Sequence, residues 1–262
     1  MTYRILYILI TIVITSYLQA ACSSGEATQN LSSGASSEQI MSARSSAEQL
    51  FAQRADLDKL REAIRLIGAV RDPNKRDYDV EWTYARYNYF LGHHTDNDSE
   101  AEKAFTQGKD AAKIAANMNP DRPEGNFWYG ANLGELCKRS PVTVGIRNVD
   151  EVRGAMKKVI AVDPGYQGAS AYDVLEQIEL ATRMKDGTAE KAVEYLQKAL
   201  EFEKENSGIY VHLAQAYLAL NKDAEAKRQL DQVLKMKPSA EYVPEHAEYL
   251  AEAKKLLESR FQ

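Results

Sequence analysis

Cys22 is the residue whose position most clearly indicates chemistry. It follows the small residues Ala20 and Ala21, which come soon after an uncharged apolar run over residues 5–18. A transmembrane helix needs about 20 apolar residues, so this shorter run is more typical of a secretion signal. The pattern predicts cleavage before Cys22 and lipid attachment to its thiol. Simple secretion and a retained short anchor are the alternatives, and all three place the mature chain outside the cytoplasm.

The second cysteine, Cys137, has no evident partner if Cys22 carries lipid. A single thiol within a helical pattern is most simply a small buried apolar residue. A disulfide between the amino terminus and an internal helix is the less favoured alternative. The spacing of the two cysteines does not resemble a zinc site, in which cysteines are paired a few residues apart.

Other polar pairs offer groups for catalysis or metal binding. His93 and His94 could share a metal with Asp96 or Asp98, but a solvated loop with Asp98 or Ser99 as helix cap is the favoured interpretation. Glu176 and Glu179 lie three apart and are expected on one solvated helix face. The sequence has no recognisable Ser-His-Asp order or nucleotide-binding loop. We therefore expect no catalytic residues, no metal and no cofactor.

Aromatic side chains crowd two segments, "YDVEWTYARYNYF" (78–90) and "NFWYG" (126–130). Trp82 and Tyr89 are interpreted as packing between helices. The other candidates should line one apolar wall that binds a ligand or partner peptide, and Tyr87 with Phe90 should be exposed there. These wall candidates are Tyr87, Phe90, Phe127 and Trp128. Asn132 joins the binding candidates because a buried amide in a helix needs a partner, either a loop backbone group or a bound ligand.

The elements that position these residues are predicted to be helices almost throughout. Gly and Pro are sparse, at 14 and 7 of 262 residues, and Ala, Leu, Lys and Glu are abundant. The net charge of −5, without a basic stripe, argues against a nucleic-acid partner. We expect a signal peptide over 1–21, a lipid-anchored Ser/Gly-rich tether over 22–38, and one helical domain over 39–262.

An internal repeat defines the arrangement of these helices. Ala192, Leu196 and Ala199 are each followed 34 residues later by a residue of similar type, which is the tetratricopeptide period. Similar patterns recur 40 and 44 residues further upstream, with the extra residues in loops. The sequence predicts an all-α, tetratricopeptide-type α-solenoid of four to five helical hairpins. Residues 244–261 form an amphipathic segment that should cap its carboxyl end.

With "GNFWYGANLGELCKRSPVTVGIRNVDEV", "VDPGYQGA" and "VPEH", the chain resembles the T-component family of TRAP transporters. The resemblance covers roughly residues 45–261. It implies a non-enzymatic, often lipid-anchored protein of the bacterial cell envelope, located in the periplasm. It further implies association with the periplasmic solute-binding subunit of an uptake system, a possible homotrimer and a path for a small apolar ligand. An envelope scaffold that binds a peptide or protein in its groove is the alternative.

Overall fold

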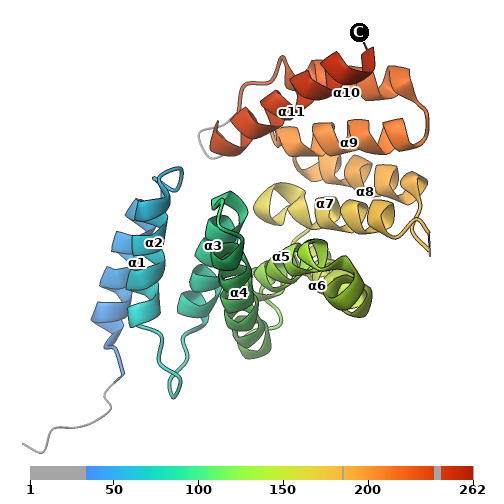
Figure 1. Ribbon diagram of the computed structural model, residues 1–262. Helices are drawn as coiled ribbons and strands as arrows, with labels where there is room; N and C mark the ends of the chain where they lie inside the picture. Colours follow the sequence, from blue (N-terminus) through green and yellow to red (C-terminus); the bar gives the residue numbers. More distant parts are fainter. Residues whose placement is uncertain (1–33, 185, 239–242, 262) are drawn as a thin grey trace, which may run out of the picture. The chain divides into compact units, whose positions relative to one another are not determined.

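The computed structural model describes residues 34–184, 186–238 and 243–261, and these belong to a compact unit over 34–262. The described residues form helices and no strand (Figure 1). The elements are α1 (Ser37–Phe51), α2 (Leu57–Ala69), α3 (Tyr78–His94), α4 (Asp98–Met118), α5 (Pro123–Arg139), η1 (Pro141–Gly145), α6 (Ile146–Val162), α7 (Tyr166–Ala181), α8 (Ala189–Phe202), α9 (Ser207–Ala219), α10 (Asp223–Val233) and α11 (Val243–Phe261). The predicted all-α fold is confirmed.

The first described helix begins close to the predicted start of the domain. Ser36 caps α1 in a capping box, in which its hydroxyl accepts from the Gln39 N–H and the Gln39 side chain accepts from the Ser36 N–H. The signal peptide, Cys22 and most of the tether lie outside the described residues. Within the described ranges, no helix combines the length and the apolar character that a membrane span requires.

Short polar side chains cap the start of five of the other described helices. Each accepts a hydrogen bond from a backbone N–H in the first turn, which the helix itself leaves unpaired. Asn97 caps α4, so the predicted cap at Asp98 or Ser99 is wrong by one or two residues. The side-chain caps of α2, α3, α8 and α9 are Asp56, Asp77, Thr188 and Asn206.

Consecutive helices pair into five hairpins in the described part of the chain, from α1/α2 to α9/α10, and α11 packs against α9 and α10. The second helices bury the positions that the repeat alignment makes equivalent, each at most 2% exposed. Those positions are Ala112 and Ala115 in α4, Val152, Met156 and Val159 in α6, Ala192, Leu196 and Ala199 in α8, and Ala226, Leu230 and Val233 in α10. The small residues allow close helix approach, and the larger ones fill the seam.

The first helices of the hairpins form the inner side of the solenoid. Each contacts the next, in the order α1, α3, α5, α7, α9 and α11. Successive second helices in the described ranges lie further apart, and long side chains bridge them, as in the ion pairs of Arg61 with Glu100 (2.8 Å) and Lys113 with Glu151 (3.8 Å). A stack whose first helices lie closer together curves towards them, so residues on α3, α5, α7 and α9 face a concave surface.

The start of α7 departs from helical geometry. Gln167, Gly168 and Ala169 have φ values of 50°, 62° and 59°, in the left-handed region that only glycine adopts readily. Each non-glycine residue there costs about 1–2 kcal/mol. The Asn206 amide donates to the Gly168 carbonyl (3.1 Å) and the Ser170 hydroxyl to the Gln167 carbonyl (2.6 Å), which holds this turn against the next hairpin.

Candidate binding groove

The concave side of the solenoid contains a groove of about 880 Å³. Its lining residues come from α3, α5, α7, α9 and α11, together with the η1 connection and the start of α6. This volume falls in the range of pockets that enclose small molecules or side chains of a partner. The fold therefore brings together residues from several repeats at one surface.

An aromatic wall forms one side of the groove. Phe90, Phe127 and Trp128 all line it, as the sequence predicted. The Phe90 and Trp128 ring centroids lie 6.2 Å apart, and those of Phe127 and Trp128 lie 4.9 Å apart. Phe127 also packs edge-on against Tyr166 at 5.3 Å. The aromatic wall of the groove therefore runs from α3 to α5, and Tyr166 supports it without lining the groove; Phe127 and Trp128 are themselves largely buried, at 5% and 2% exposed.

Tyr87 does not face the groove, and its predicted exposure is wrong. Its side chain is fully buried beneath α1, where its ring stacks on Phe51 with centroids 4.6 Å apart. Its hydroxyl donates to Glu48 Oε2 at 2.8 Å. The residue joins the first hairpin to the second, because α1 covers the face of α3 that carries it. Trp82 and Tyr89 are partly buried against the core, and Tyr89 also lines the groove.

Asn132 is fully buried and bonded to backbone. Its amide nitrogen donates to the Trp128 carbonyl (2.8 Å) and to the Ala85 carbonyl of α3 (3.3 Å). A Cβ on Gly108 would approach the Asn132 Oδ1 to 2.3 Å, so α4 passes directly over the amide. The structure thus pairs the amide nitrogen with helix backbone, whereas the buried Oδ1 has no hydrogen-bond partner among the described residues, and a bound ligand at Asn132 stays a prediction.

The rim of the groove carries apolar side chains that are exposed to water. Val142 in η1, Ile146 at the start of α6 and Met184 after α7 are 75%, 71% and 104% exposed. Exposed apolar side chains gathered at the edge of a concave surface are typical of interaction sites. Cys137 also lines the groove, is only partly buried, and has its thiol pKa raised by burial.

Acidic side chains from three helices add negative charge to the groove. Lys138 is the one lysine or arginine among the described lining residues, and it pairs with Glu135 at 2.7 Å. Glu252 accepts a hydrogen bond from Gln215 at 2.7 Å. The lining carboxylates are Glu135, Asp173, Glu245, Glu248 and Glu252. A partner with cationic groups beside apolar ones would complement this surface.

A polar cluster of Asp173, Glu176 and His212 is set into the groove wall. His212 Nδ1 is hydrogen-bonded to Asp173 Oδ1. The other oxygen of this carboxylate, Oδ2, accepts a hydrogen bond from the Gln177 amide at 3.1 Å. Burial by itself lowers the pKa of His212, but the charge of Asp173 and its hydrogen bond to the ring raise that pKa by more, to about 9. Burial and the charge of Asp173 raise the pKa of the Glu176 carboxyl to about 8, so it is protonated at neutral pH.

The solvated face predicted for Glu176 and Glu179 is wrong, since they are 1% and 4% exposed. Glu179 accepts from the Thr188 N–H at 3.3 Å and lies 3.9 Å from Arg153. Sequence reasoning missed Asp173 and His212 altogether. The available signal was the three-residue spacing of Asp173 and Glu176 together with a histidine about one repeat later.

The histidine pair predicted in a loop lies instead in the last turn of α3. His93 is exposed and lines the groove, while His94 is hydrogen-bonded to the Phe90 carbonyl (2.9 Å) and to Glu248 of α11 (3.1 Å). His94 therefore helps to connect α11 to the groove. Neither histidine belongs to the cluster around Asp173.

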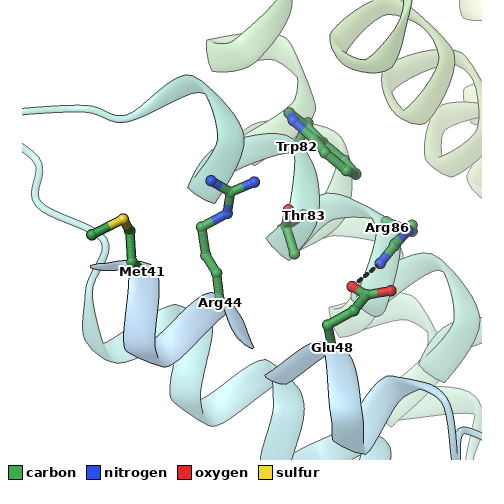
Figure 2. Close-up of a pocket in the computed structure, with 6 residues that line it drawn as sticks. All are labelled: Met41, Arg44, Glu48, Trp82, Thr83 and Arg86. Atoms are coloured by element: carbon green, nitrogen blue, oxygen red, sulfur yellow. Dashed lines mark hydrogen bonds and ion pairs between the residues drawn. The ribbon is translucent and has the colours of Figure 1, made fainter. Parts of the chain in front are cut away.

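A smaller pocket of about 450 Å³ lies between α1 and α3 (Figure 2). Arg44 extends from α1 towards α3, and Glu48 is hydrogen-bonded to Arg86. Arg44 and Arg122 each lie 3.2 Å from Asp79, and the Trp82 indole donates to Asp79 at 3.0 Å. These internally paired charges join helices, and we assign the pocket no binding role.

Comparisons with known proteins agree with the fold. The family model "Regulator of microtubule dynamics protein 1-3" matches residues 44–172, slightly less than half the chain, and a tetratricopeptide-repeat model matches residues 183–243. No curated protein sequence matches significantly.

Two solved structures have the same helical-repeat fold. A thermophilic tetratricopeptide protein of Thermus thermophilus is 18% identical, with 83% of this chain and 98% of the other covered and a TM-score of 0.60. MamA from Desulfovibrio magneticus is 16% identical, with 87% and 100% covered and a TM-score of 0.51.

The fold and its groove define a helical-repeat solenoid with a concave binding surface. The chain is a tetratricopeptide-repeat protein. The segment over 125–152, which carries much of the predicted resemblance to the T-component family, falls within the match to the microtubule-dynamics model. Membership of the T-component family therefore stays a prediction.

Proposed function

We propose that the protein is a non-enzymatic scaffold whose concave groove binds a segment of a partner protein. The observation that carries this proposal is the groove of about 880 Å³ with an aromatic wall and exposed apolar residues at its rim. Covering Val142, Ile146 and Met184 would remove apolar surface from water, which favours association. Several helices hold the wall in place, so the protein loses little conformational freedom when a partner binds.

The charges of the groove indicate the chemistry of that segment. Carboxylates from α5, α7 and α11 outnumber the single described lysine of the lining. Several already have partners, such as Glu245 with Arg54 (2.8 Å), but Glu248 remains half exposed beside His94. A segment with apolar side chains and at least one Lys or Arg fits best, because its cation reaches the rim while its apolar groups meet the wall.

The finer proposal is that this partner is the periplasmic solute-binding subunit of a TRAP-type uptake system. It is supported by the motifs shared with the T-component family and by the predicted signal and lipidation at Cys22. In this proposal the protein stands in the periplasm on a lipid anchor and a tether. The groove also has the volume for a small apolar ligand.

The experiment compares two single lysine substitutions on the same helix. Ile146→Lys places a cation at the apolar rim, whereas Val162→Lys changes an exposed apolar residue at the other end of α6, outside the groove. Titration calorimetry with a purified TRAP solute-binding protein from the same organism should give a measurable affinity for wild type and for Val162→Lys. Ile146→Lys should weaken binding by about tenfold or more, because burial of an Ile side chain contributes about 1.5–3 kcal/mol.

Two results would count against the proposal in different ways. Absence of binding by wild type would remove the solute-binding subunit as the partner while leaving the groove itself untouched. If both variants lose affinity equally, or if neither variant loses affinity, the partner binds elsewhere and the groove is not its site.

A further inference from the structure

We propose that Asp173, Glu176 and His212 form a binding site for a divalent transition-metal ion of the zinc type in the wall of the groove. The donor atoms of these three side chains all lie within 4.8 Å of one another. Two come from α7 and the third from α9, so the site joins consecutive repeats. This site is separate from the apolar rim that carries the proposed partner interaction.

The geometry is close to what a metal needs. In a tetrahedral site with bonds of about 2.0–2.1 Å, ligand atoms are roughly 3.4 Å apart. Since no two of these donor atoms lie more than 4.8 Å apart, the closing movement that a metal requires is at most roughly 1.4 Å, shared by two side chains. The His212 nitrogen and the Asp173 oxygen already face one another across a hydrogen bond, and they would move apart to about 3.4 Å for an ion to replace the shared proton.

Glu176 provides a second, independent indication of a ligand. Its side chain is 1% exposed, and its buried Oε2 atom has no hydrogen-bond partner among the described residues. A buried polar atom without a partner is unfavourable and rare in native proteins. Since Glu176 belongs to the same cluster as Asp173 and His212, a bound cation would satisfy this oxygen and the neighbouring charges together.

The donor set selects the class of ion. One imidazole and two carboxylates suit zinc and related first-row ions better than calcium or magnesium, which prefer oxygen alone. Asp173 and His212 line the groove, so an ion bound to three protein ligands keeps a position that solvent or a partner can reach. Gln177 donates to Asp173 and would orient that carboxylate as an outer partner.

The test uses cobalt as a visible probe and zinc as competitor, with the purified full chain. Wild type should bind one Co²⁺ per chain, and Zn²⁺ should displace the bound Co²⁺. The cobalt spectrum should show visible d–d bands and should lack the near-ultraviolet charge-transfer band of a thiolate ligand. Glu176→Gln and His212→Gln should each weaken binding by more than about a hundredfold, because losing an outer partner alone costs 10–100-fold. Zinc should raise the melting temperature of wild type and not that of Glu176→Gln.

Matched controls replace groups of the same types outside the cluster. Glu62→Gln, on α2, and His94→Gln remove a carboxylate and an imidazole and should leave cobalt affinity unchanged. Glu176→Gln should fold, because it is close in shape to the protonated acid, and Asp173→Asn gives a second variant. The proposal is overturned if wild type binds no cobalt with saturation, if Glu176→Gln binds as tightly, or if the spectrum shows a thiolate ligand.

Discussion

Truncation of Tyr87 distinguishes a core residue from a groove residue. The side chain is fully buried, stacks on Phe51 and donates to Glu48. Replacing a buried aromatic residue with Ala costs about 3–5 kcal/mol, so we expect Tyr87→Ala to lower the free energy of unfolding by about 4 kcal/mol. Tyr87→Phe removes only the hydroxyl, whose partner Glu48 is 58% exposed, and should cost about 1 kcal/mol.

Urea unfolding followed by circular dichroism measures these differences. Phe202→Ala is the control, since Phe202 is 50% exposed and its truncation should cost about 1 kcal/mol. Hydrogen exchange should show that Tyr87→Ala loosens α1 and α2 most, because the residue joins that hairpin to α3. If Tyr87→Ala unfolds within about 0.5 kcal/mol of wild type, its burial under α1 is wrong and the groove assignment is restored.

Two further predictions concern packing and pH. Gly125→Ala should destabilise the protein by about 1–3 kcal/mol or more, because a Cβ there would lie 2.4 Å from the Ala116 nitrogen. Gly154→Ala is the control, since its Cβ would meet nothing within 4 Å, and it should stabilise the protein by up to about 1 kcal/mol. Thermal melts that show similar changes for both variants would contradict this packing. The paired hydrogen bonds from Arg61, with one from Thr95, lower the pKa of Glu100 from 4.5 to about 2. The resulting stabilisation, up to about 1 kcal/mol, is therefore present above pH 4.5 and is lost as the pH falls towards 2. The stability difference between wild type and Glu100→Gln should shrink over that interval, and a constant difference would refute the ion pair.

The repeat seams could be predicted from the sequence because the same local requirement recurs. Ala192, Leu196 and Ala199 and their counterparts at the 34-residue spacing are all buried where second helices pack. Each hairpin needs small residues for close approach and larger ones to fill the seam, so periodicity alone identifies them.

The binding groove could be predicted only in part. Phe90, Phe127 and Trp128 lie along it because consecutive first helices share one face of a solenoid. Tyr87 was misplaced because the first hairpin covers α3, and the local sequence of α3 does not show which face α1 occupies. Glu176 was misplaced for a similar reason: a three-residue spacing gives a shared face without saying whether α9 covers it. The predicted lipidation of Cys22 lies outside the described residues and stays a prediction.

Site-specific photo-crosslinking in the native cell tests the central claim, that the concave groove binds a partner protein, most directly. A photoreactive amino acid at Ala181, exposed at the groove, should give a discrete adduct, whereas one at Lys157, exposed on α6 outside the groove, should not. Mass spectrometry should map the adduct to a partner segment with apolar residues beside Lys or Arg. Adducts from Lys157 alone, or equal adducts from both positions, would contradict the account.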